Sequence, residues 1–297
     1  MKAFSFSFFL EKADIHLSTT KSMWFRDETK RVDDSVDIDM FEQRLVGAKI
    51  IALAHNELPI WFPKLLFVSH VIQPQMFVFC TTDIAFNDDD LQVLYDAFPN
   101  TYFLITNYIG KLPRCILLPL GNTNYDETVN EEKKTMICIT YCTPNSKDRE
   151  EFYAFLQANP IFQELCIPQI FGRDYNIVLS QSYFSVCCCG NGYDTYRFWE
   201  SLCNKSIPIV KQNVFFDTLK HQYPKLPFVS IDEWTDLYKI ISKLTPEYYK
   251  DLVSKSDWSI AFEDIWQSKL SDLVNTPSEV AHHVPHFSAN FAGEDCY

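Results

Sequence analysis

The residues most able to do chemistry in this chain of 297 residues lie between Gly190 and Glu200. A Gly-Asn-Gly turn at 190–192 follows the apolar run Tyr183–Cys189, which is typical of a strand buried on both faces of a parallel sheet. Glycines allow a tight turn and leave backbone N–H groups uncovered. Because a helix N-terminus behind glycines attracts phosphate, the segment predicts an anion site where a buried strand ends.

The helix expected after this turn has two chemically different faces. At about 100° per residue, its polar side chains fall within one arc of roughly 100° and its apolar side chains fill the opposite arc. Asp194 or Thr195 can cap its start, and Asn204 suits its end. The polar arc holds Arg197, Glu200, Ser201 and Asn204, and the apolar arc holds Phe198, Trp199, Leu202 and Cys203.

The pattern G-N-G-x-D-x-x-R-x-W-E-x-L-x-x-x-x-I-P-I-V at 190–210 resembles the donor-site motif of exostosin-like glycosyltransferases of the GT-B type. Lys205-Ser206 replaces the small Gly-Cys pair that usually precedes Ile-Pro. The resemblance implies an α/β GT-B fold, in which two Rossmann-like domains face a cleft. It also implies that the glycine loop and Arg197 hold the diphosphate of a nucleotide sugar, while Glu200 binds the ribose. The alternative is a Rossmann-like half-domain in which Arg197 and Glu200 form a surface ion pair.

Other cations are candidates for the same diphosphate. Departure of a nucleotide diphosphate builds negative charge that the site must stabilise. Lys147 and Arg149 open the first helix of the second domain, and Arg173 lies near the place where related enzymes seat the base. Ordinary surface or loop packing is the alternative for each. The expected donor-binding residues are Gly190, Asn191, Gly192, Asp194, Arg197, Glu200, Arg149, Lys147 and Arg173.

An inverting transfer also needs a base that takes the proton of the acceptor hydroxyl. The resemblance places the acceptor on the N-terminal half, so the base is expected beyond a strand of that half. Asp83 follows the apolar run Met76–Cys80 and is the first candidate. His55 and Glu57 follow the strand expected at Lys49–Ala54 in the same way.

No metal or further cofactor is expected. The Asp-x-Asp patterns at 37–39 and 88–90 do not follow a buried strand, so surface roles are expected for them. His282, His283 and His286 lie in a Pro-broken tail. The phosphate charge is therefore assigned to arginine and backbone N–H groups.

The composition restricts which classes of binding partner and which cellular compartment are expected. The net charge of −13 argues against binding to nucleic acid or to anionic membranes. The ten cysteines include three consecutive ones at 187–189 and no CxxC pair, which favours reduced thiols in a cytoplasmic setting. Phe4–Leu10 is too short for a signal peptide and alternates like a strand, and no membrane span is expected.

Strands and helices alternate along the chain, as in doubly wound folds. We expect an acceptor-side domain at 1–122, a nucleotide-sugar domain at 123–275 and a tail at 276–297, with the last helix crossing back to the first domain. The expected strands are Ala3–Phe9, Lys49–Ala54, Gln75–Cys80, Thr101–Thr106, Arg114–Leu118, Thr135–Tyr141, Tyr183–Cys189, Ser206–Lys211 and Phe228–Ile231. The expected helices are Ile60–His70, Asp88–Phe98, Lys147–Ala158, the motif helix, Val214–His221, Glu233–Leu244 and Pro246–Val274.

The whole pattern is similar to the small cytosolic transferases with which large DNA viruses build capsid glycans. That looser likeness implies a UDP-sugar such as UDP-xylose, or a GDP-sugar, and the cytoplasm of a host cell. We therefore expect an inverting, metal-independent glycosyltransferase that acts on an oligosaccharide or glycoprotein acceptor. A nucleotide-sugar epimerase or hydrolase on the same scaffold, and a non-catalytic nucleotide-sugar-binding module, are the alternatives.

Overall fold

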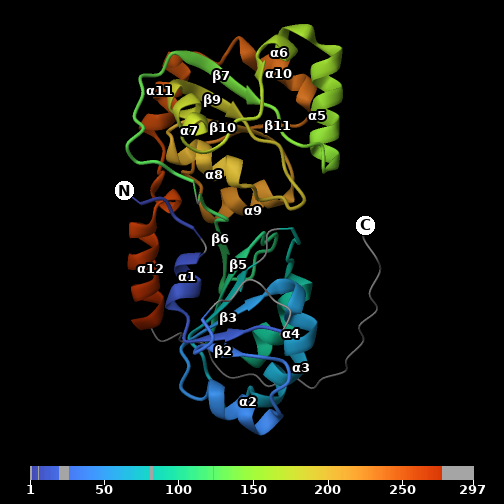
Figure 1. The fold of residues 1–297 in the computed structure, drawn as a ribbon, viewed down its shortest axis with the longest axis vertical. Helices are drawn as coiled ribbons and strands as arrows, with labels where there is room; N and C mark the ends of the chain where they lie inside the picture. Colours follow the sequence, from blue (N-terminus) through green and yellow to red (C-terminus); the bar gives the residue numbers. More distant parts are fainter. Residues whose placement is uncertain (1, 6, 20–26, 81–82, 123, 276–297) are drawn as a thin grey trace.

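The computed structural model describes residues 2–5, 7–19, 27–80, 83–122 and 124–275, apart from the side chain of His55. The chain forms two parallel sheets, one above the other in Figure 1. The first has six strands in the order β2-β1-β3-β4-β5-β6, and the second has five in the order β11-β10-β9-β7-β8. The predicted α/β class, with two separate parallel sheets, is confirmed.

The first sheet lies in the interior of the first domain, and helices cover both of its faces. Every residue of β3 and β4 is buried, which explains their continuous apolar sequences. The strands are β1 Ile15–Leu17, β2 Arg31–Val32, β3 Ile50–Ala54, β4 Met76–Cys80, β5 Tyr102–Thr106 and β6 Cys115–Leu118. The helices are α1 Ser7–Lys12, α2 Ile38–Leu45, η1 His55–Glu57, α3 Leu58–Val68 and α4 Asp88–Ala97.

The strand predicted at Ala3–Phe9 is wrong. Ala3 and Ser5 form only single antiparallel bridges, and Ser7 begins helix α1. Phe8 and Phe9 are both buried in the core. Adjacent aromatic residues can both reach one core from a helix, whereas a strand would send one of them to the opposite face.

The second sheet carries the predicted motif. Its strands are β7 Thr135–Thr140, β8 Cys166–Ile167, β9 Ser182–Val186, β10 Ile207–Lys211 and β11 Val229–Ile231. Its helices are α5 Lys147–Ala158, α6 Pro160–Glu164, α7 Gly172–Gln181, α8 Tyr196–Cys203, α9 Val214–Gln222, η2 Trp234–Asp236, α10 Leu237–Ile241 and α11 Pro246–Ser254. Strand β9 ends at Val186, so the run 187–189 already belongs to the loop that leads to the glycines.

Helices α12 (Glu263–Asn275) and α9, which follow the second sheet's strand β10 in the chain, both contact the first part of the chain. After η3 Ser259–Ala261, helix α12 runs beside α1, as Figure 1 shows. Its Trp266 ring lies 5.1 Å from that of Phe4 and 5.8 Å from that of Phe9. Gln222 of α9 accepts from the Leu117 N–H at 2.8 Å and donates to the Cys115 carbonyl at 3.0 Å, so it satisfies the free edge of β6. The expected tail, 276–297, lies outside the described residues. Among the described helices, none is long and apolar enough to cross a bilayer.

Candidate active site

A cavity of about 490 Å³ opens at the carboxyl ends of β7 and β9. Asp83 and Leu120 line it from the first domain, and the remaining lining comes from beyond residue 122. Open α/β sheets bind their ligands at this edge. Seven of the predicted donor-binding residues line the cavity: Gly190, Asn191, Gly192, Asp194, Arg197, Glu200 and Arg149.

Arg197 reaches the cavity from the first turn of α8 and is held in place by β7 and α7. Its Nη1 donates to the Thr140 carbonyl at 3.2 Å and its Nη2 to the Tyr141 carbonyl at 3.4 Å. Its guanidinium also lies 5.6 Å from the centre of the Tyr175 ring. These partners are uncharged, so the positive charge of Arg197 is not neutralised by an ion pair with a described carboxylate.

Arg149 brings a second guanidinium to the same loop from helix α5. Ser146 caps that helix, and Arg149 Nη1 donates to Asn145 Oδ1 at 2.7 Å and to the Thr143 carbonyl at 3.2 Å. A Cβ atom on Gly190 would lie 3.1 Å from Arg149 Nη2. The glycine therefore lets the guanidinium pack directly against the loop backbone.

The loop between the two guanidiniums offers backbone donors. Gly190 N donates to the Gly192 carbonyl at 3.1 Å, which closes the turn. The N–H groups of Asn191 and Gly192 have no hydrogen-bond partner within the described parts of the chain. Two cations and open N–H groups around one loop form a site for a diphosphate.

Glu200 lines the cavity one helical turn after Arg197. Burial raises the pKa of its carboxyl group, while the charge of Arg197 and a hydrogen bond from Asn124 oppose the increase.

The rest of the predicted polar face has a structural role. Ser201 donates to the Arg197 carbonyl, and Asn204 Nδ2 donates to Asn176 Oδ1 of α7 at 2.8 Å. Only Arg197 and Glu200 of that face therefore reach the cavity.

Asp194 bridges the domains, a role that its spacing in the sequence did not indicate. Its Oδ2 accepts from the Leu120 N–H at 2.7 Å, its Oδ1 accepts from Trp199 Nε1 at 2.6 Å, and its own N–H donates to Asn107 at 2.7 Å. Burial raises the pKa of Asp194 to about 7 despite these bonds. The helix begins after Thr195, which makes no side-chain cap. A contact of Asp194 with the donor stays a prediction.

Cys142 is a residue of the cavity that sequence reasoning missed. Its thiol is buried at the end of β7, and Tyr153 Oη lies 3.9 Å from Sγ. A hydrogen bond from Cys188 and the charges of Arg197 and Arg149 lower the pKa of Cys142, although burial opposes this. The sequence signal that could have indicated Cys142 is its position directly after a strand of the site.

Of the three candidate bases, the structure brings Asp83 to the cavity. Glu57 is buried in η1, where its carboxylate accepts from the Thr19 N–H and the Thr19 hydroxyl at 2.9 Å each. The backbone of His55 begins η1, and its side chain is outside the described atoms. Position therefore favours Asp83 over Glu57.

The two remaining predicted donor residues lie elsewhere. Arg173 is on α7, where it pairs with Asp126 and donates to Thr128 Oγ1 at 2.8 Å, and it does not line the cavity. Lys147 lines a second cavity on the other side of the glycine loop. The spacing of these residues in the sequence could not reveal that neither of them lines the first cavity.

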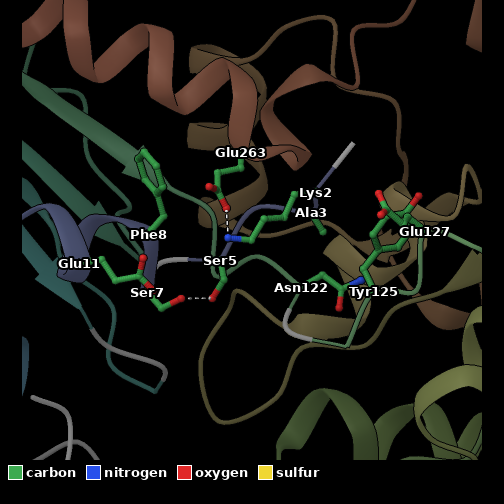
Figure 2. Close-up of a pocket in the computed structure, with 10 residues that line it drawn as sticks. All are labelled: Lys2, Ala3, Ser5, Ser7, Phe8, Glu11, Asn122, Tyr125, Glu127 and Glu263. Carbon is green, nitrogen blue, oxygen red and sulfur yellow. Dashed lines mark hydrogen bonds and ion pairs between the residues drawn. The ribbon is translucent and has the colours of Figure 1, made fainter. Parts of the chain in front are cut away.

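A further cavity of about 480 Å³ lies at the N-terminus, beside α12. Figure 2 shows Glu11, Glu127 and Glu263 around it, and Lys2 Nζ pairs with Glu263 at 2.7 Å. No predicted site residue whose side chain is described lines this cavity. Its acidic lining makes it a poor place for a phosphate.

The acidic patterns considered for metal binding have local structural roles. Asp37 caps α2 through the Met40 N–H, and Asp88 accepts from Tyr108 Oη and the Lys111 N–H. Within the described ranges, no group of three or more His, Cys, Asp or Glu side chains could hold a metal ion. The histidines at 282, 283 and 286 are outside those ranges.

No family model and no curated protein matches this sequence. The chain is similar to solved structures at 10% identity or less. TarM has a TM-score of 0.48 at 10% identity, over 80% of this chain and 57% of TarM. The pneumococcal O-GlcNAc transferase GtfA, solved with UDP and GlcNAc, scores 0.44 at 10% identity, over 80% of this chain and 60% of GtfA. An α-glucosyltransferase solved with UDP and a 13-mer DNA scores 0.40 at 7% identity, over 89% of this chain and 88% of that chain.

The chain spans less than two thirds of the length of TarM and of GtfA. At such identities and scores, the argument for the fold rests on the two parallel sheets themselves. The argument for a function rests on the residues of the cavity.

Proposed function

We propose that this chain is a GT-B glycosyltransferase that uses a nucleotide-diphosphate sugar. The single observation that carries the proposal is the convergence of Arg149 and Arg197 on the Gly190–Gly192 loop. Among the described residues, both guanidiniums bond only uncharged oxygens, so they remain available to a diphosphate. Glu200 binds the ribose hydroxyls in this proposal, as the resemblance to exostosin-like enzymes implies.

The proposed reaction is a direct displacement at the anomeric carbon. The acceptor hydroxyl oxygen forms the new bond to C1 while the bond from C1 to the phosphate oxygen breaks. Asp83 takes the hydroxyl proton, and the nucleoside diphosphate leaves with the bonding electrons. Arg149, Arg197 and the loop N–H groups stabilise the charge that develops on it. Such a displacement inverts the configuration at C1 and requires no metal.

The donor in this proposal is a UDP-sugar, with UDP-xylose first and a GDP-sugar second. Phe171 supports a base-binding role because its ring is 73% exposed at the cavity. Stacking on an exposed aromatic ring accepts any base, so Phe171 does not choose between uracil and guanine. The nine cysteines of the described ranges are free thiols, which supports an enzyme of a reducing compartment such as a host cytoplasm.

A thermal-shift screen of UDP, GDP, UDP-xylose and UDP-glucose tests the donor assignment. A true ligand at about 100 times its dissociation constant adds roughly 2.7 kcal/mol to the free energy of unfolding. Release of UDP that requires an added acceptor supports transfer. Release without acceptor supports the hydrolase, and binding without turnover supports the binding module. No shift with any nucleotide contradicts the proposal.

A further inference from the structure

A second cavity, of about 810 Å³, adjoins the first across the glycine loop. Both cavities are lined by Asp83, Asn145 and the loop Gly190–Gly192. The rest of the second cavity comes mainly from the start of α5 and the end of β10. A ligand in each cavity would therefore meet the other at the loop, next to Asp83.

The cations of the second cavity are already neutralised. Lys211 Nζ lies 2.6 Å from a carboxylate oxygen of Glu151 and 2.8 Å from one of Glu233. Lys147 Nζ lies 3.9 Å from the other oxygen of Glu151. The two arginines of the first cavity, in contrast, form no ion pair with any carboxylate that the structure describes. Phosphate is therefore favoured in the first cavity and disfavoured in the second.

The second cavity instead presents uncharged hydrogen-bonding groups. Gln212 Nε2 donates to Asp217 Oδ1 at 2.7 Å, which orients the amide and leaves its Oε1 without a described partner. The side chain of Asn191 is exposed at the same cavity, and the partly buried Tyr193 lines it with an aromatic ring. An amide acceptor, an amide donor and an aromatic surface suit a polyhydroxylated ring.

We propose that the second cavity binds the acceptor and that this acceptor is an uncharged glycoside, with Gln212 as a specificity-determining residue. The inference rests on the proposed function. It departs from the expectation that the first domain binds the acceptor, because, of the described residues of that domain, Asp83 and Ala85 alone line the cavity. The acceptor hydroxyl then reaches Asp83 and the anomeric carbon where the two cavities meet.

Saturation-transfer NMR with a set of methyl glycosides of neutral hexoses and pentoses, and with methyl glucuronide, tests this proposal. The full chain is measured with and without UDP. At least one neutral methyl glycoside is expected to bind in the presence of UDP and to bind more tightly than methyl glucuronide. Gln212→Leu is expected to weaken that binding about 3- to 10-fold, the effect of one lost neutral hydrogen bond, and to leave UDP affinity unchanged. Asp251→Asn, in the exposed Lys255 pair on α11, is the control and should change neither.

A second variant tests the charge argument. Glu151→Gln removes the carboxylate that Lys211 and Lys147 share, so the ratio of methyl glucuronide to neutral glycoside affinity should increase. The proposal is overturned if no neutral glycoside binds while UDP does, or if Gln212→Leu leaves glycoside binding unchanged. It is also overturned if Gln212→Leu weakens UDP-sugar but not UDP, because the cavity would then hold the sugar of the donor. Failure of UDP itself to bind would instead contradict the proposed function.

Discussion

Replacement of Arg197 by lysine distinguishes a guanidinium that binds a diphosphate from one that only supports the fold. The guanidinium is aimed by two carbonyl oxygens, at 3.2 and 3.4 Å, and by the Tyr175 ring at 5.6 Å. A lysine keeps the charge but has no planar fork, so it cannot hold both carbonyls and still reach a phosphate with a second donor. Loss of one hydrogen bond to a charged group costs about 1.5–3 kcal/mol. UDP affinity should therefore fall about 10- to 150-fold.

Isothermal titration calorimetry of UDP with the wild type, Arg197→Lys and Arg197→Ala measures this effect. Turnover of Arg197→Lys should be nearly as poor as that of Arg197→Ala. Arg173→Lys is the matched control, because Arg173 pairs with Asp126 outside the cavity, and it should bind UDP like the wild type. If Arg197→Lys retains UDP affinity within about two-fold, the guanidinium only supports the fold and the donor-site reasoning is refuted.

Four further outcomes are expected. Asp83→Asn should lower turnover about 10²–10⁴-fold, the usual size of a general-base effect, with UDP affinity unchanged in calorimetry; normal turnover would remove Asp83 from the mechanism. EDTA should leave turnover intact, and a loss that Mn²⁺ or Mg²⁺ restores would contradict the metal-independent mechanism. Burial raises the pKa of Asp194 to about 7, so the folded state binds a proton on this carboxyl group more tightly than the unfolded state does. The contribution of Asp194 to the free energy of unfolding therefore falls as pH rises from about 4 to 7. Urea midpoints at pH 5 and pH 8 should differ less in Asp194→Asn than in the wild type, and equal differences would contradict this. Because the pKa of Cys142 is lowered, iodoacetamide should alkylate this thiol at pH 7 more readily than the other buried cysteines, and UDP should protect it. Mass spectrometry of the modified peptide checks this, and labelling that UDP does not affect would argue against diphosphate binding beside this thiol.

The elements that the sequence predicted well have strong local signals. Strands β3, β4 and β5 are continuous apolar runs because helices cover both faces of their sheet. Helix α5 has the predicted bounds because Ser146 caps its first turn. Strands β1 and β2 are only three and two residues long, too short for a recognisable periodicity. Helix α7 escaped prediction because Phe171 provides no side-chain cap before it.

The candidate site was predictable where its residues follow one another along a single loop and helix. Gly190, Arg197 and Glu200 were placed together by the motif, and the structure brings all three to one cavity. Contacts between distant residues could not be read from the sequence. The pairing of Arg173 with Asp126 spans 47 positions, and the bond from Leu120 to Asp194 spans 74. Such contacts depend on the packing of the two sheets, which local spacing does not encode.

A crystal structure of the protein with UDP, grown in the presence of EDTA, tests the central claim most directly. The account predicts the diphosphate against the Gly190–Gly192 loop, with its oxygens bonded by both Arg149 and Arg197 and the ribose hydroxyls at Glu200. UDP bound elsewhere, or a diphosphate that neither arginine contacts, would contradict it.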